Sequence, residues 1–174
     1  MTAYNILRNS EGFYYVFCKL EEIDTVPKFT PDSEKRRRDL EEYEKRHRQL
    51  PFLMSPMITN GALAIELAFK FLIFKENLEF ECEHKLDILF LQLPQKYGDE
   101  LRTKIYEQIH QNEESLMKNL NQISNLFVEA RYSFERDTIG YSNFFTDLVH
   151  LVCDYVIDMK KEYIHEEDDI LADD

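Results

Sequence analysis

Apolar residues recur along most of the chain at the three- and four-residue spacings of α-helices. The segment Met57–Asn77 is apolar around most of its circumference, which is typical of a central, buried helix. Residues 81–97 and 99–111 each carry one apolar face, and residues 116–134 alternate spacings of four and three, as in a helix that packs along a partner. Tyr141 to about Tyr163 is strongly amphipathic. The pattern predicts an all-α protein, an antiparallel helical bundle.

The N-terminal element, residues 1–29, allows two interpretations. Asn9 to Gly12 is a turn-rich segment between two stretches of strand-favouring residues, which is the pattern of a β-hairpin. Phe13, Phe17 and Leu20 instead lie at the i, i+4 and i+7 positions of a helix. We expect a helix from about Gly12.

Capping residues predict the first residues of two helices. Thr30-Pro31 places a capping side chain before a proline at the first helical position, and the helix that follows has only Leu40, Tyr43 and Leu50 as an apolar edge. We therefore expect this helix to lie outside the main core. Asn112 followed by two glutamates predicts a second start, because acidic side chains favour the positive end of the helix dipole.

Composition supports one helical domain. The chain has 174 residues, only four glycines and five prolines, and 44% apolar residues, so it is rich in core material and poor in turns. Sandwiches and barrels need many more turns. We expect a single domain over residues 1–174, in which residues 165–174 form a frayed, solvated acidic tail.

The charge and the cysteine content indicate which partners and which cellular compartment to expect. The 34 acidic and 21 basic residues give a net charge of −13, which works against non-specific attraction to nucleic acid. Cys18, Cys82 and Cys153 are scattered, so we expect reduced thiols and a cytoplasmic protein. The N-terminus lacks the pattern of a signal peptide, and the apolar stretch Leu67–Phe74 is too short to span a membrane. No glycine-rich phosphate loop, GxSxG or HExxH motif is present, and we expect no cofactor.

Single polar residues each have a functional and an ordinary interpretation. Glu66 and Lys70 share one stripe of the most apolar helix, so they either line a cleft or form a simple i, i+4 ion pair. His84 lies among Glu81, Cys82 and Glu83, which suggests a metal site. Residues two apart on a helix do not face each other and no second ligand cluster exists, so we expect no metal and a capping or core-edge histidine.

Two further groups are weighed in the same way. His150 has Asp147 and Asp154 at i−3 and i+4, which is either a base with carboxylate partners or, as we expect, the solvated side of an amphipathic helix. The basic run Lys35–Arg38 could contact RNA. The acidic residues Asp39, Glu41, Glu42 and Glu44 follow the run, before and among further basic residues, which favours an exposed helix with many salt bridges.

Three stretches carry a resemblance to a known family. They are GALAIELAFKFLIFK (Gly61–Lys75), EHKLDILFLQLP (Glu83–Pro94) and EARYSFERD (Glu129–Asp137). In this order and spacing they resemble the HEPN family of helical proteins. The resemblance implies an antiparallel bundle that forms a homodimer with a cleft at its two-fold axis. It further implies work beside a nucleotidyltransferase partner in prokaryotic toxin–antitoxin or defence systems, and in many members RNA cleavage through an Arg-x(4–6)-His motif.

The sequence departs from that motif. Arg131 matches its arginine, but residues 136–138 are Arg, Asp and Thr, so the histidine is missing. An arginine remains protonated and cannot act as the base, although Arg131 and Arg136 could hold a phosphate. The resemblance places Glu66, Lys70, Arg131 and Tyr132 at the edges of the cleft, with Arg136 nearby, and it leaves the catalytic residues unknown.

Three functional hypotheses follow. The first is a binding or regulatory module, a HEPN-like dimer whose cleft binds a nucleotide, RNA or a protein partner. The second is a divergent metal-independent endoribonuclease in which His84 or His150 supplies the base. The third is a structural protein-interaction module. A histidine near Arg131 would favour the second, and a dry apolar groove without clustered charge would favour the third.

Overall fold

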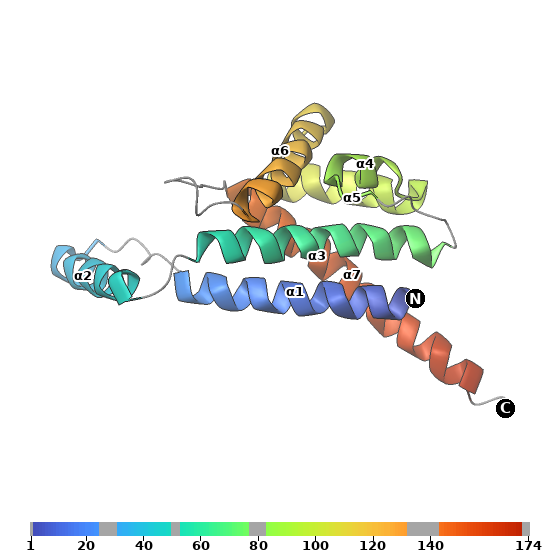
Figure 1. The fold of residues 1–174 in the computed structure, drawn as a ribbon, viewed down its shortest axis with the longest axis horizontal. Helices are drawn as coiled ribbons and strands as arrows, with labels where there is room; N and C mark the ends of the chain where they lie inside the picture. Colours follow the sequence, from blue (N-terminus) through green and yellow to red (C-terminus); the bar gives the residue numbers. More distant parts are fainter. Residues whose placement is uncertain (1, 25–30, 50–52, 77–82, 132–142, 172–174) are drawn as a thin grey trace.

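The computed structural model describes residues 2–24, 31–49, 53–76, 83–131 and 143–171 (Figure 1). Within these ranges the side chains of residues 24, 46–49, 54, 126–131 and 161–171 are not described. The described residues form helices and contain no strand, which confirms the all-α prediction. The helices are α1 (Ala3–Asp24), α2 (Ser33–Gln49), α3 (Met54–Lys75), α4 (Leu86–Leu91), α5 (Gln95–Ile109), α6 (Glu113–Arg131) and α7 (Asn143–Leu171).

α3 is the centre of the bundle, as its apolar pattern predicts. It runs beside α1 in the opposite direction and also packs against α4, α6 and α7 (Figure 1). Its side chains Ile65, Ala68, Phe69 and Leu72 are completely buried. Since α1, α4, α6 and α7 all pack against it, α3 organises one continuous core.

α1 is a helix over almost the whole N-terminal element. The predicted helix start near Gly12 was wrong, and so was the alternative hairpin, because the helix begins at Ala3 and runs through Asn9–Gly12. Ser10, which looked like a turn residue, is buried against α3 and its hydroxyl donates to the Ala64 carbonyl at 2.9 Å. That bond satisfies a polar group that would otherwise be costly to bury.

Gly61 sets how closely α1 and α7 approach α3. A Cβ atom at Gly61 would lie 2.7 Å from Phe145 of α7 and 3.0 Å from Phe17 of α1. The two aromatic rings pack edge to face, with centroids 6.0 Å apart. Only a glycine leaves room for both rings at this point.

α2 stands apart from the bundle, as its narrow apolar edge predicts. Among the described residues it makes no extensive packing contact with another helix, and Leu40 is 43% exposed (Figure 1). The predicted start at Thr30-Pro31 was wrong. The helix begins at Ser33, and the Asp32 carboxylate caps it by accepting the N–H groups of Glu34 and Lys35. Leu50 lies outside the described residues.

The middle helices differ from prediction at their ends. α4 is only six residues long, much shorter than the helix predicted over residues 81–97. Gly98, which separates that range from the helix predicted over residues 99–111, lies inside α5, which starts after Pro94. The start after Asn112 is confirmed, because its side-chain oxygen accepts the Ser115 N–H at 2.9 Å. The apolar faces predicted for these helices are buried where their side chains are described, except that Ile109 is only partly buried. They are buried at Leu86, Leu89, Phe90, Leu93, Leu101, Ile105, Leu116, Leu120 and Ile123.

α7 crosses the bundle and buries the face predicted for it. Phe145, Leu148, Val152 and Val156 are buried, and the helix continues to Leu171. Most of the predicted frayed tail, residues 165–174, is therefore helical backbone.

Ser55–Lys75 of α3 is long and apolar enough to cross a membrane by length and composition alone. In the sequence, the apolar stretch Leu67–Phe74 was judged too short to span a membrane, but that stretch is only part of this helix. Within the bundle, 72% of the most apolar window is buried, as in the core helix of a globular protein.

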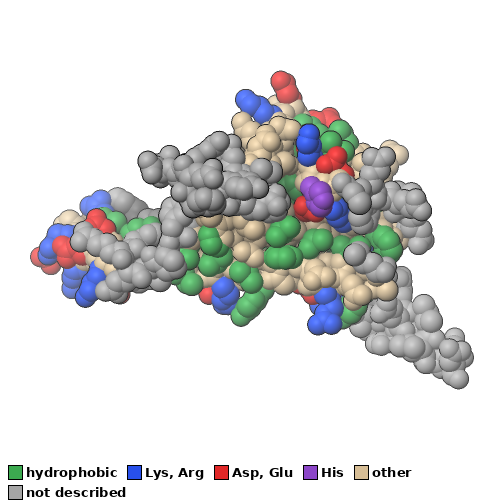
Figure 2. Space-filling view, in the orientation of Figure 1, with side chains coloured by type: hydrophobic (Ala, Val, Ile, Leu, Met, Phe, Trp, Pro, Cys, Tyr) green, Lys and Arg blue, Asp and Glu red, His purple; other side chains and the backbone are tan. Residues whose placement is uncertain are grey.

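One side of the α1–α3 pair is not covered by the described helices. Figure 2 shows hydrophobic side chains spread over both helices on this face, with a histidine flanked by acidic and basic groups beside them. An open groove of about 590 Å³ lies there. Its walls mix polar and apolar residues, namely Asn5, Ile6, Arg8, Asn9, Phe13 and Leu67. The groove therefore has polar and charged residues in its walls, unlike the dry apolar groove expected for a structural protein-interaction module.

Candidate functional site

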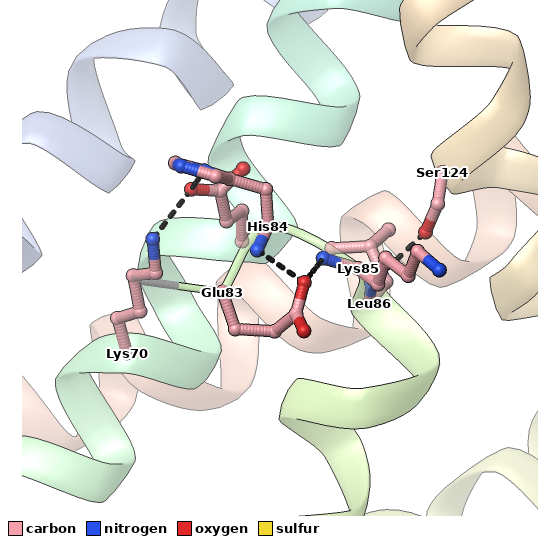
Figure 3. A network of polar contacts seen from close by, with 7 residues as sticks. Lys70, Glu83, His84, Lys85, Leu86 and Ser124 are labelled. Atoms are coloured by element: carbon pink, nitrogen blue, oxygen red, sulfur yellow. Dashed lines mark hydrogen bonds and ion pairs between the residues drawn. The ribbon is translucent and has the colours of Figure 1, made fainter. Parts of the chain in front are cut away.

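Glu66, Lys70 and His84 form one polar cluster at the edge of the open face. The Lys70 Nζ atom lies 2.7 Å from Glu66 Oε1, and His84 Nδ1 lies 2.9 Å from the same oxygen (Figure 3). The Glu66 and Lys70 side chains are only 7% and 10% exposed, whereas the His84 side chain is 70% exposed. A buried carboxylate therefore joins a buried ammonium to an exposed imidazole.

The backbone around His84 is held in place by two independent anchors. The Glu83 carboxylate accepts the N–H groups of His84 and Lys85, both at 2.8 Å (Figure 3). The N–H of Leu86, the first residue of α4, donates to the hydroxyl of Ser124 on α6 at 2.9 Å. These bonds satisfy N–H groups at the start of a helix, and they fix where His84 emerges from the chain.

The same hydrogen bonds change the pKa of Glu83. The N–H groups donated by Lys85 and then by His84 lower the pKa of the Glu83 carboxyl below its ordinary value, because both bonds favour the charged form. The turn that carries His84 is consequently held by an ionised Glu83 at neutral pH.

The contact with Glu66 selects the state of the imidazole. A carboxylate oxygen only accepts hydrogen bonds, so His84 Nδ1 must carry a proton. In neutral His84 the lone pair is then on Nε2, the nitrogen directed away from Glu66. A buried carboxylate that fixes the tautomer of an exposed histidine is an arrangement that enzymes use to prepare a base, and binding sites use to prepare a donor.

The structure brings together two of the five residues predicted for the cleft. Glu66 and Lys70 form the expected i, i+4 pair, and they also share a cluster with His84. Arg131 is the last residue of α6 and its side chain is not described, while Tyr132 and Arg136 lie outside the described residues. His84, interpreted from sequence as a capping or core-edge residue, contacts the buried Glu66 from the edge of the core.

His150 belongs to a second polar cluster, between α1 and α7. Its Nε2 lies 2.8 Å from a Glu21 carboxylate oxygen and its Nδ1 lies 2.8 Å from the Tyr14 hydroxyl. Tyr14 also donates to Asp154 at 2.9 Å. The expectation that His150 faces solvent beside Asp147 was wrong, because its ring packs edge to face on Tyr14 and Phe17 of α1.

This second cluster is poorly suited to nucleophilic chemistry. Burial, followed by the hydrogen bond to Asp154, raises the pKa of Tyr14 above its ordinary value. Burial likewise raises the pKa of the nearby Cys18 thiol. Groups whose neutral forms are favoured are weak nucleophiles at neutral pH. The contacts of Tyr14 with His150 and Asp154 instead join α1 to α7.

Metal ligands do not gather in the part of the chain that is described. No group of three or more His, Cys, Asp or Glu side chains within those ranges is arranged to hold a metal ion. Cys82 and Glu81, which prompted the metal interpretation of His84, lie outside those ranges. Cys18 and Cys153 are free thiols.

The basic run lies on the exposed helix α2. Arg37 donates to Glu41 one turn later at 2.8 Å, which is the kind of salt bridge that the interleaved charges predict. Lys35, Arg37 and Arg38 are all exposed, and α2 stands well away from α4, the helix that follows His84 (Figure 1). This run therefore contributes no basic surface next to His84.

Comparisons of the chain with protein-family models, curated proteins and solved structures find no match. The functional argument accordingly rests on the geometry of the Glu66 cluster.

Proposed function

We propose that this protein is a HEPN-like helical binding module whose Glu66–Lys70–His84 cluster recognises a phosphate group of a nucleotide or an RNA end. The observation that carries the proposal is the buried Glu66 carboxylate, which holds an exposed imidazole at 2.9 Å and a lysine at 2.7 Å. A binding site needs exposed donors whose orientation is fixed beforehand, and His84 meets that requirement.

The chemistry of the cluster suits an anion. With Nδ1 bound to Glu66, protonation of His84 at Nε2 presents one N–H donor to solvent at a defined position. A charge-assisted bond from that donor to a phosphate oxygen is the strongest single contact the imidazole can offer. The Lys70 ammonium, 2.7 Å from Glu66, offsets the negative charge of the carboxylate that holds the imidazole.

The surrounding surface suits a ligand larger than phosphate. The groove and the cluster share helix α3, since Leu67, which lines the groove, follows Glu66 in that helix. Phe13 of α1 adds an aromatic side chain to the same groove. A phosphate at His84 with a base or ribose over the groove would use both features.

The test is a binding measurement with a matched pair of ligands. Fluorescence anisotropy is measured for one short single-stranded RNA carrying either a 5′-phosphate or a 5′-hydroxyl, and calorimetry is run with a mononucleotide. We expect the phosphorylated RNA to bind more tightly. Replacing His84 with Ala should weaken that binding by about tenfold or more, because it removes one charge-assisted bond.

The control is a second exposed histidine. His110 ends α5 in a left-handed conformation with φ of 57°, which asparagine also tolerates, so His110→Asn tests loss of an exposed imidazole without strain. We expect it to bind as the wild type does. Equal affinity for both RNA ends, or equal loss in both variants, would refute the proposal.

A second candidate function is favoured by the tautomer of His84. A neutral imidazole with its Nε2 lone pair exposed and Nδ1 held by a carboxylate can take the proton from a ribose 2′-hydroxyl, which is the step that metal-independent RNA cleavage requires. In this alternative, His84 replaces the missing histidine of the Arg-x(4–6)-His motif and Arg131 stabilises the phosphate.

The cleavage assay separates the two functions. RNA is incubated with the protein in the presence of a chelator, and the wild type is compared with His84→Ala and Arg131→Ala. Cleavage that both substitutions abolish would establish the endoribonuclease. Phosphate-dependent binding without cleavage would leave the binding module as the function.

A further inference from the structure

Three hydrogen bonds join α1 to α7 in the His150 cluster, which consists of Tyr14, Glu21, His150 and Asp154. We propose that these bonds require a doubly protonated, positively charged His150, which makes the contact between α1 and α7 sensitive to pH. The contact is tight when the imidazole is charged and weakens when the ring loses one proton. This inference does not depend on ligand binding at His84, and its test uses no ligand.

The positions of the protons follow from the contacts. A carboxylate only accepts hydrogen bonds, so the Tyr14 hydroxyl donates its single proton to the exposed Asp154 at 2.9 Å. Burial and then this hydrogen bond raise the pKa of Tyr14, so the hydroxyl keeps that proton. Its oxygen can therefore only accept from His150 Nδ1, which lies 2.8 Å away. His150 Nε2 lies 2.8 Å from a Glu21 carboxylate oxygen and must donate as well, so both ring nitrogens carry a proton.

Loss of either proton breaks one of the three bonds. Without the Nδ1 proton, the single proton of Tyr14 has to serve both His150 and Asp154. Without the Nε2 proton, a ring lone pair faces the Glu21 carboxylate. An acceptor between the two helices is then left without a donor, which costs stability. The contribution of the cluster is thus present where the imidazole is charged and is lost as the pH rises.

The surroundings of His150 suit a positive charge that exchanges with solvent. Glu21 of α1 binds the ring directly, and Asp154 of α7 is bound to it through Tyr14. Asp147, also exposed, precedes His150 by about one helical turn. These acidic groups stabilise the charge that the hydrogen bonds require. The His150 side chain is 36% exposed, so the proton can leave to water and return from it.

The other elements around α7 bring no further charge into contact with the ring. α3 and α5 also pack against α7. The charged side chains described on α3, and those on α5 that reach α7, do not contact His150; they are Glu66, Lys70, Lys75, Glu100 and Lys104. On α1, burial raises the pKa of the Cys18 thiol, which therefore stays uncharged near Tyr14 at neutral pH. The charge of His150 is thus matched by Glu21 and Asp154.

A second contact between the same helices provides a comparison. Lys160 Nζ of α7 lies 2.7 Å from a Glu11 carboxylate oxygen of α1. Lysine and glutamate ordinarily titrate far from the range of histidine, so this ion pair keeps its charges where an imidazole changes. It holds α7 to α1 when His150 loses a proton. A rise in pH should therefore weaken the contact between the helices without separating them.

The test is a double-mutant cycle between His150 and Glu21, measured by urea denaturation at about pH 5.5 and about pH 8, on either side of the ordinary titration of histidine. His150→Phe keeps an aromatic ring and removes both nitrogens, and Glu21→Gln removes the charge. The cycle cancels the separate effects of the two substitutions. We expect the pair to change the unfolding equilibrium constant by about fivefold at the lower pH, as one net hydrogen bond does, and by less than about twofold at the higher pH.

The control cycle uses Lys160→Met and Glu11→Gln, whose coupling should be the same at both pH values. Nitrogen-15 NMR of the wild-type protein gives a readout that needs no variant. At about pH 5.5 the two ring nitrogens of His150 should both show the shifts of a protonated imidazole, and loss of one proton at higher pH should also move the signals of Tyr14. A ring with one proton at about pH 5.5, or equal coupling of His150 and Glu21 at the two pH values, would overturn the proposal.

Discussion

Glu66 and His84 are 18 positions apart in the sequence, yet their side chains meet at 2.9 Å. One is buried in the central helix and the other stands in solvent, so the contact joins the core to the surface. The carboxylate is also bound by Lys70 at 2.7 Å. A change at Glu66 should therefore affect both the stability of the fold and the orientation of His84.

Removing the Glu66 carboxylate tests how much it contributes to the stability of the fold. Replacing Glu66 with Leu takes away an ion partner at 2.7 Å from the buried Lys70, which we expect to lower the free energy of unfolding by about 3 kcal/mol. Urea denaturation followed by circular dichroism measures it. The double variant Glu66→Leu with Lys70→Met should lose clearly less, because it replaces both charges with apolar groups. A double variant as unstable as the single one would contradict this account.

Local pattern predicted the helices well because their apolar faces are long. α3 and α7 each repeat apolar residues over many turns, so the periodicity of the buried face is unmistakable. α1 was harder, because Asn9 to Gly12 have the local preferences of a turn. Tertiary packing overrides those preferences, since Ser10 finds a buried acceptor on α3.

The candidate site could be predicted only in part. Glu66 and Lys70 share a helix face, so their contact follows from a spacing of four. The contact of His84 with Glu66 depends on the course of the chain between α3 and α4, which local pattern does not encode. The prediction for His150 was wrong for a related reason. Helical spacing related it to Asp147 and Asp154, but its ring turns to Tyr14 on a helix more than a hundred positions away.

Gly61 should be intolerant of even one methyl group. Gly61→Ala places its Cβ 2.7 Å from the Phe145 ring and 3.0 Å from Phe17, and we expect a loss of about 2 kcal/mol of stability through overpacking. Gly98→Ala is the matched control, because its Cβ would meet the flexible end of the Arg102 side chain at 3.0 Å and otherwise make an ordinary contact with Leu93 at 3.8 Å. Denaturation midpoints compare the two variants, and an equal effect of both would show that close approach at Gly61 is not required.

Tyr14 joins α1 to α7 through its hydroxyl group. Tyr14→Phe removes the bonds to His150 at 2.8 Å and Asp154 at 2.9 Å while it keeps the ring, and we expect a loss of about 1–2 kcal/mol. Tyr15→Phe, at a neighbouring exposed ring, should change the stability by less than about 0.5 kcal/mol. Thermal and urea unfolding measure both. Equal stability of the two variants would mean that the Tyr14 hydroxyl contributes nothing to the packing of α7.

Alkaline pH should destabilise the fold through its buried acids. Burial raises the pKa of the Cys153 thiol well above its usual range, and burial also raises the pKa of Cys18 and Tyr14. A group whose pKa is higher in the folded state contributes stability that is complete below its unfolded pKa and is lost as the pH rises through the folded one. For a thiol the loss begins near its unfolded pKa of about 8.5.

The measurement is urea denaturation across a series of alkaline pH values. We expect the wild-type free energy of unfolding to fall as the pH rises, and Cys153→Ala to lessen that fall because it removes the most deeply buried thiol. Cys18→Ala should have a smaller effect, since Cys18 is only partly buried. Iodoacetamide labelling adds a second readout, in which Cys153 should react only when the protein unfolds. Rapid labelling of Cys153 in the folded protein, or an unchanged pH slope in Cys153→Ala, would contradict the burial of this thiol.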